Sequence, residues 1–184
     1  MSLKKFLQDY ETVITTDDKG RDKRKLVYRG DYFETNLDTP GHKRFKLIVI
    51  ALTLIIIGLH IGAGFIGNPG MYMFFVALPY VAAFFPLIYL AAGALRLPRE
   101  KRRFQRDEIN LSFDRMRVSV ITLLVFLVIG ILGEGIFLVF VAEEISPGKE
   151  ALFLVLEILA AAITISLILI ERKIKIETSG TSSQ

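Results

Sequence analysis

The chain has 184 residues, 52% of them hydrophobic, with a formal net charge of +4 and no cysteine. Soluble domains of this size rarely have so large an apolar share, and the lack of cysteine excludes disulfides, thiol catalysis and cysteine-ligated zinc or iron–sulfur sites. The apolar residues are gathered into long blocks, which indicates an integral membrane protein.

The first 44 residues are predicted to form a small cytoplasmic appendage. Within residues 2–11 apolar side chains recur at helical spacing, which predicts an amphipathic helix on the inner leaflet or on the protein's own surface. Residues 11–16 and 25–29 are rich in β-branched or aromatic side chains and flank a polar turn with a glycine, which predicts a β-hairpin. Because a two-stranded hairpin is marginally stable alone, it needs the helix, the bilayer or a partner for support.

Four apolar runs follow, each long enough to cross about 30 Å of hydrocarbon as a helix that rises about 1.5 Å per residue. They are residues 45–66, 71–95, 118–141 and 151–170. None has the polar stripe of a helix in a soluble bundle, and the first begins too late in the chain to be a cleaved signal peptide. We therefore predict an all-α integral membrane protein, a four-transmembrane-helix bundle that carries the small N-terminal helix and hairpin.

Lysine and arginine are distributed unevenly over the segments that connect these runs. Residues 1–46 hold eleven and residues 96–117 hold eight, whereas the link at 67–70 holds none and the link at 142–150 holds one. Basic segments of multi-pass proteins stay on the cytoplasmic side. We therefore expect both termini and the 96–117 loop to be cytoplasmic, in a bacterial plasma (inner) membrane by default. The positive charge then needs no nucleic-acid partner to explain it.

The second run contains Pro79 and Pro86. Each proline removes a helical hydrogen bond and frees the carbonyl four residues earlier, at Phe75 and Ala82. Membrane helices tolerate such prolines where neighbours compensate. The prediction is a kink that serves helix packing, with a gating bend as the alternative.

The 96–117 loop mixes charged residues with an apolar face, so part of it is predicted to extend the third span into the cytoplasm as a helix. Its basic residues either contact anionic lipid headgroups or only fix the topology. The candidates for headgroup contact are Arg99, Lys101, Arg102, Arg103 and Arg106. Residues 172–184 are predicted to form a disordered cytoplasmic tail, because the end of the chain is small and polar.

Three ionisable residues interrupt the apolar runs: His60, Glu134 and Glu157. Each lies six or seven residues inside the outer end of its own run, which corresponds to a depth of about 9–11 Å. Small or polar residues share their helix faces, as is typical of contacts inside a membrane bundle. Because charge in hydrocarbon is costly, we predict that these side chains meet in one buried polar cluster, with Tyr80 near the same level as a hydrogen-bond donor.

Three interpretations of this cluster stay open. It is a structural pairing of His60 with a carboxylate, or a proton- or cation-handling site in which two carboxylates share a proton. The third interpretation is a site, open to the outer side, for a small ligand or for a polar group of a partner protein. Histidine and two carboxylates can also bind zinc. No zinc-motif spacing supports a metal here, and no cofactor is expected.

The sequence carries no catalytic signature, since it has no nucleophile elbow, Walker loop, dinucleotide-binding turn or zinc-binding helix motif. We therefore expect a non-enzymatic accessory or interaction subunit of a membrane assembly, in contact with membrane lipid and with a protein partner or further copies of itself. The alternative is a small proton- or cation-coupled transporter or channel that uses His60, Glu134 and Glu157. An enzyme that acts on lipid ranks third.

Overall fold

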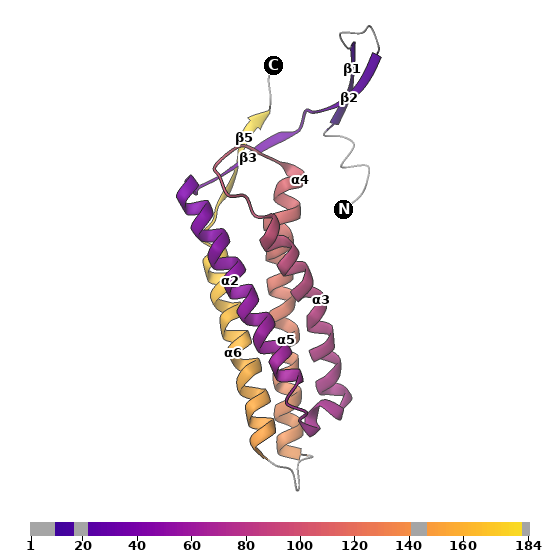
Figure 1. Cartoon of the computed structure of the whole chain (residues 1–184), viewed down its shortest axis with the longest axis vertical. Helices are drawn as coiled ribbons and strands as arrows, with labels where there is room; N and C mark the ends of the chain where they lie inside the picture. The colour runs from indigo at the N-terminus through magenta and orange to yellow at the C-terminus, as the bar shows by residue number, and fades with distance from the viewer. Residues whose placement is uncertain (1–9, 17–21, 141–146, 182–184) are drawn as a thin grey trace.

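The structure, a computed structural model, describes residues 10–16, 22–140 and 147–181. Four long helices run side by side along the molecule, and the strands gather at one end (Figure 1). The helices are α2 (Thr39–Gly64), α3 (Phe74–Arg96), α5 (Arg115–Phe140) and α6 (Pro147–Glu171). All four are long and apolar enough to cross a membrane, as the apolar runs predicted.

A local signal sets the start of the first long helix. The Asp38 side chain caps α2 by accepting a hydrogen bond from the Gly41 backbone N–H at 2.8 Å, and Pro40 occupies the first turn, where a proline removes no helical hydrogen bond. α2 therefore begins at Thr39, ahead of the predicted start at residue 45.

Shorter helical turns flank two of the long helices. The 3₁₀ turn η1 (Pro69–Tyr72) leads into α3 after Gly67, whose φ of +62° lies in the left-handed region that glycine tolerates. α4 (Arg106–Ile109) and the π-helical turn η2 (Asn110–Asp114) run directly into α5, which makes one helix of 35 residues. At about 1.5 Å per residue this helix is about 52 Å long, more than hydrocarbon requires. The expected helix that continues from the 96–117 loop into the third apolar run is confirmed.

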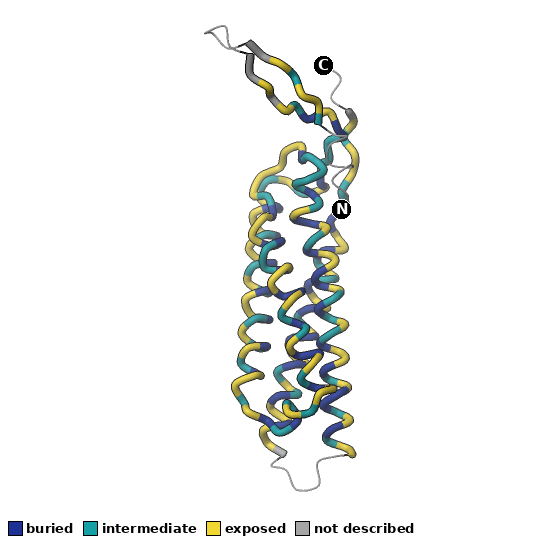
Figure 2. The backbone as a smooth tube through the Cα atoms, turned by 90° about the vertical axis from the view of Figure 1, so that its right-hand side faces the viewer, coloured by how far each residue is buried: buried dark blue, intermediate teal, exposed yellow. Residues whose placement is uncertain are grey.

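Apolar side chains cover the outside of the bundle as well as fill its interior. Large apolar residues are exposed on every long helix, among them Leu54, Phe85, Leu132 and Leu169. Figure 2 shows how exposed and buried positions alternate along all four helices. Soluble monomers rarely expose apolar surface on this scale, and such a surface agrees with four helices that are long and apolar enough to cross a membrane.

Each long helix packs against two neighbours, in the order α2, α3, α5, α6 and back to α2. A glycine permits one close approach: a β-carbon on Gly133 of α5 would lie 2.6 Å from the Phe75 carbonyl oxygen of α3. Pro79 is the residue that frees this carbonyl from helical hydrogen bonding. Contact with the glycine backbone, weakly favourable through Cα–H···O interactions, favours the packing interpretation of Pro79 over a gating bend.

Two small antiparallel sheets lie at the end of the bundle where α2 begins (Figure 1). β1 (Tyr10–Thr16) and β2 (Asp22–Tyr28) form the predicted hairpin. β3 (Asp31–Thr35) is the central strand of a second sheet, between β4 (Phe104–Gln105) and β5 (Ile176–Thr181). No sequence pattern predicts this second sheet, because its strands come from three distant segments of the chain.

The C-terminal segment is ordered where the sequence predicts a disordered tail. Residues 176–181 form β5, so the prediction for residues 172–184 is wrong there; residues 182–184 lie outside the described part of the chain. Asn36 holds the segment in register, since its side-chain oxygen accepts a hydrogen bond from the Lys175 backbone N–H at 3.1 Å, 139 residues away. Local composition cannot reveal a pairing partner so distant in sequence.

The predicted amphipathic helix over residues 2–11 lies mostly outside the described residues. Its last two positions, Tyr10 and Glu11, belong to β1. The prediction is therefore wrong at its C-terminal end, because pairing with β2 extends the hairpin to Tyr10.

Glu34 gives the three-stranded sheet a dependence on pH. The Ser179 hydroxyl on β5 donates a hydrogen bond to Glu34 Oε1 at 2.6 Å, and Arg103 donates to the same oxygen at 3.2 Å. These bonds lower the pKa of Glu34 below its ordinary value. Because the folded-state pKa is the lower one, this stabilisation is present above the unfolded-state pKa and is lost as the pH falls through the folded-state pKa.

We expect the backbone amides of residues 176–181 to lose protection against hydrogen exchange severalfold between neutral pH and a pH below the folded-state pKa of Glu34. The measurement is exchange protection corrected for intrinsic rates at each pH. In Glu34→Gln, which does not titrate, protection should stay constant over the same range. Equal protection of the parent protein at both pH values would contradict the assignment.

Candidate functional site

His60 and Glu157 are paired in the interior of the bundle. The distance between His60 Nδ1 on α2 and Glu157 Oε1 on α6 is 2.9 Å, with side chains 0% and 4% exposed. The other ring nitrogen of the histidine, Nε2, lies 3.1 Å from the Tyr80 carbonyl oxygen on α3. Three helices therefore meet at one imidazole ring.

The hydrogen-bond geometry is met by arrangements of the pair that carry no net charge. A carbonyl oxygen only accepts, so His60 Nε2 must carry the proton that it donates to Tyr80. Nδ1 then either carries a second proton and faces a carboxylate, or accepts a proton from a protonated Glu157. In both cases one proton lies between the two side chains and the pair has no net charge. A neutral pair costs far less to bury than an isolated charge.

The Tyr80 side chain packs beside the His60 ring. Its hydroxyl donates a hydrogen bond to the His60 carbonyl oxygen at 2.8 Å, and the two ring centroids are 4.3 Å apart. A β-carbon on Gly64 would overlap the tyrosine hydroxyl. The glycine one turn after the histidine is therefore what lets Tyr80 reach the α2 backbone.

Glu134 lies in a second polar group with Glu150. Glu150 accepts hydrogen bonds from the Asn68 side-chain amide at 2.6 Å and from the Gly70 backbone N–H at 3.1 Å. Glu134 has Glu150 and Asn68 as its polar neighbours, and a β-carbon on Gly70 would overlap its carboxyl group. This group joins α5, α6 and the link between α2 and α3.

The Glu134 carboxyl accepts no well-formed hydrogen bond from the part of the chain that the structure describes, although the Asn68 side-chain amide lies close to it. Both of its oxygens are buried without a partner, and the residue is 0% exposed. Glu150 is also 0% exposed, and a carboxylate cannot donate. One proton held between the two carboxyls would supply the missing donor and remove the repulsion of two like charges.

The structure therefore brings together three of the four residues of the predicted cluster and places the fourth elsewhere. His60 contacts both Glu157 and Tyr80, whereas the contacts of Glu134 are with Asn68, Gly70 and Glu150. Agreement in depth is not sufficient to predict contact, because helix rotation and tilt decide which residues face one another.

Sequence reasoning missed Asn68 and Glu150 as members of a buried site. Both fall in the links between spans, where polar residues are ordinarily solvated. The available signal is the position of Glu150 in the first turn of the last helix, where carboxylates accept hydrogen bonds from free backbone N–H groups. Here those N–H groups come from another segment, which only the tertiary structure reveals.

The basic residues predicted to meet lipid headgroups mostly have protein partners. Arg102 pairs with Glu108, Arg103 with Glu34, and Arg106 with Asp31. Lys101 donates its backbone N–H to the Thr39 hydroxyl, and Arg99 is exposed. Arg103 and Arg106 therefore link the 96–117 loop to β3, and Arg102 links the start of the loop to α4 within it. Contact of these residues with lipid stays a prediction.

Other buried polar residues at the sheet end are also paired. Glu171 is 3% exposed and accepts a hydrogen bond from Arg117 Nε at 2.8 Å. His42 Nε2 lies 2.8 Å from the Thr35 hydroxyl. No group of three or more histidine, aspartate or glutamate side chains in the described ranges is arranged to hold a metal ion.

Comparison with known proteins identified no similar protein. The sequence matches no protein family and no curated protein, and the fold matches no solved structure. Function must therefore be argued from the two buried polar groups and from the surface of this chain.

The proton shared by His60 and Glu157 can be tested by substitution. We expect Glu157→Ala to destabilise the bundle by about 1–3 kcal/mol, because it leaves His60 Nδ1 buried without a partner. Glu157→Gln should cost less, since its amide can donate to the Nδ1 of a neutral histidine. The measurement is unfolding in detergent followed by circular dichroism.

Glu100→Ala, at an exposed position of the 96–117 loop, is the matched control and should leave stability unchanged. Equal losses in Glu157→Ala and Glu157→Gln would mean that the hydrogen bond to His60 does not determine stability.

Proposed function

We propose that the chain is a non-enzymatic, multi-pass membrane protein that acts as an interaction subunit of a larger membrane assembly. The observation that carries this proposal is the β1–β2 hairpin, which stands away from the bundle at the sheet end (Figure 1). Two large apolar side chains of this hairpin, Ile14 and Leu26, are 64% and 63% exposed.

The exposed apolar residues share one face of the hairpin. In its register Thr12 pairs with Leu26 and Ile14 with Arg24, so Ile14 and Leu26 are diagonal neighbours on the same side. Tyr10 and Tyr28, also paired, lie on this face at the base of the hairpin. An apolar face on a two-stranded element, which is marginally stable in water, fits a partner that covers it.

The base of the hairpin is fixed to the rest of the protein. The Tyr10 hydroxyl donates a hydrogen bond to Asp107 Oδ2 at 2.9 Å, and its ring packs edge-on against Tyr28 at a centroid distance of 5.3 Å. Tyr28 in turn packs against Tyr32 at 5.3 Å. A firmly held base presents the apolar face in one direction, which reduces the entropic cost of binding a partner.

Membrane insertion is part of the proposal and is supported by the apolar outer surface of the four long helices. The basic segments lie at the end of the bundle that carries the sheets, at residues 29–46, 96–117 and 172–175. By the positive-inside rule this end, with both termini, would be cytoplasmic. The hairpin would then reach partners on the cytoplasmic side of a plasma (inner) membrane.

The hairpin can be tested by site-specific photo-crosslinking in cells. We expect a photoreactive amino acid at Leu26 to give a single reproducible adduct with another protein, because this face is covered in the assembly. The same amino acid at Val27, which points to the opposite face, should give none. Band patterns and the identity of the adduct by mass spectrometry are the readouts.

A matched pair of double variants tests the same face. Ile14→Thr with Leu26→Thr should abolish the adduct formed from a probe at Arg24, whereas Val13→Thr with Val27→Thr on the opposite face should preserve it. Threonine keeps the strand propensity in both. Adducts of equal yield from both faces, or from neither, would rule out docking through the hairpin.

A second candidate function, proton- or cation-coupled transport, is favoured by one observation: Glu134 is buried, and no described residue forms a hydrogen bond of normal geometry with its carboxyl. A carboxyl group that gains a partner only by holding a proton is a site where protons can be exchanged. The neutral pair of His60 and Glu157 is another proton-holding site in the same bundle.

Transport can be measured with the full chain in proteoliposomes that enclose a pH-sensitive dye. If this candidate function holds, Glu134→Gln should lower proton flux at least about tenfold, because an amide cannot take up and release the proton. Glu177→Gln, exposed on β5, should leave flux unchanged. Flux no higher than in empty vesicles, or equal flux in parent and Glu134→Gln, would eliminate the transport function and leave the interaction function standing.

A further inference from the structure

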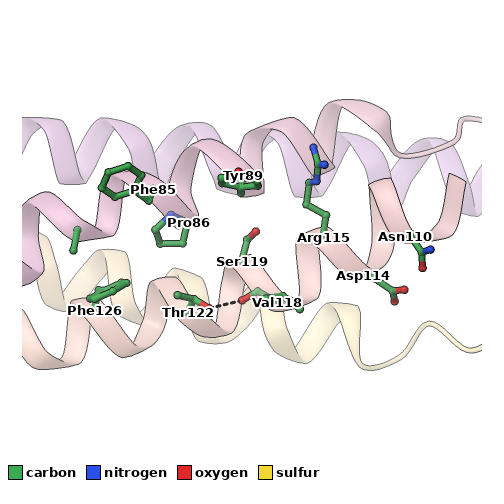
Figure 3. Close-up of a pocket in the computed structure, with 11 residues that line it drawn as sticks. Phe85, Pro86, Tyr89, Asn110, Asp114, Arg115, Val118, Ser119, Thr122 and Phe126 are labelled. Carbon is green, nitrogen blue, oxygen red and sulfur yellow. Dashed lines mark hydrogen bonds between the residues drawn. The ribbon is translucent and has the colours of Figure 1, made fainter. Parts of the chain in front are cut away.

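A groove runs along the outside of the bundle between α3 and α5, with a volume of about 570 Å³. Figure 3 shows Phe85, Pro86 and Tyr89 of α3 facing Phe126 and Thr122 across it. None of the residues of the two buried polar groups lines it. The groove is therefore a separate feature that neither proposed function uses.

Polarity changes along the length of this groove. One end is lined by aromatic and apolar side chains, and the other by Asn110, Asp114 and Arg115 (Figure 3). The apolar part between Val118 and Phe126 spans about 12 Å of helix, close to the roughly 15 Å of hydrocarbon in one leaflet. The charged end would then lie at the level of the lipid headgroups on the sheet side.

Arg115 is positioned to bind an anion at the charged end. Its guanidinium lies over the Tyr89 ring, 5.5 Å from the centroid, and this contact holds the side chain at the groove. Arg115 forms no ion pair with any carboxylate in the described part of the chain, whereas nearby Arg117 pairs with Glu171. A guanidinium in this situation suits bidentate recognition of a phosphate.

We propose that the groove binds one zwitterionic glycerophospholipid from the leaflet on the sheet side. An acyl chain lies between Phe85 and Phe126, the phosphate binds Arg115, and the ammonium of the headgroup faces Asp114. The two charges that line the groove sum to zero, which matches a headgroup of zero net charge better than an anionic one. This inference rests on the proposed membrane insertion and not on docking through the hairpin.

A lipid fits the lining better than a helix of another protein does. Helix–helix contacts in membranes favour small residues that let backbones approach, whereas Phe85, Tyr89 and Phe126 are bulky. Phe85 and Tyr89 are 67% and 55% exposed, so their rings stand out from the surface beside the groove rather than form a flat packing surface.

The test uses the full chain in detergent, stripped of lipid and titrated with phosphatidylethanolamine or phosphatidylglycerol, with bound lipid counted by native mass spectrometry. We expect Arg115→Gln to bind phosphatidylethanolamine about tenfold more weakly, the loss of roughly one charge-assisted phosphate contact. Arg44→Gln, an exposed arginine on α2 outside the groove, should bind as the parent protein does.

A second pair of variants tests the apolar part without altering charge. Ala82→Trp fills the groove and should weaken binding of both lipids, whereas Ala51→Trp, exposed on α2, should not. Circular dichroism melting verifies that each variant is folded.

Equal binding by Arg115→Gln and Arg44→Gln, or preference for phosphatidylglycerol over phosphatidylethanolamine, would overturn the proposal. The proposal would also be overturned if Ala82→Trp bound lipid as the parent protein does but no longer formed a dimer that the parent forms. That result would identify the groove as an interface between two copies of the chain. Alkaline extraction of membranes distinguishes failure of the lipid site from failure of membrane insertion. A chain that resists extraction but shows no lipid preference refutes only the lipid site. A chain that is extracted refutes membrane insertion.

Discussion

Ionisable groups buried among apolar helices are the constraint on which this structure depends. An unpaired charge in such surroundings costs several kcal/mol, so each polar group must find its partner inside the bundle. His60 finds Glu157 on one neighbouring helix and the Tyr80 carbonyl on the other. Apolar packing alone leaves a membrane helix free to rotate, whereas these directional bonds fix how α2, α3 and α6 face one another.

The same need for partners organises the sheet end of the molecule. β3 stands between a strand from the central loop and a strand from the C-terminal segment, so that three segments far apart in the chain become one unit. Arginines that could have met lipid instead pair with acidic residues of this unit, as Arg103 does with Glu34. A sheet this small has little core of its own and depends on the helices beneath it for stability.

The surface carries two features that burial does not explain. The hairpin presents apolar side chains beyond the bundle, and the groove between α3 and α5 joins an apolar channel to a guanidinium. Each fits a different class of partner because each would lie in a different medium, the cytoplasm for the hairpin and one leaflet for the groove. The buried carboxyl pair is the remaining feature that fits the second candidate function, because a carboxyl group that holds a proton can also release it.

The sequence by itself determined the four long helices, the hairpin and the presence of a buried histidine and two acids, because hydrophobic run length, strand composition and the cost of buried charge are local properties. It could not determine that Glu134 contacts Glu150 and Asn68 instead of His60, nor that residues 176–181 form a strand. Both outcomes depend on the rotation and spacing of segments far apart in the chain. Only the tertiary structure decides which side chains lie within hydrogen-bonding distance of one another.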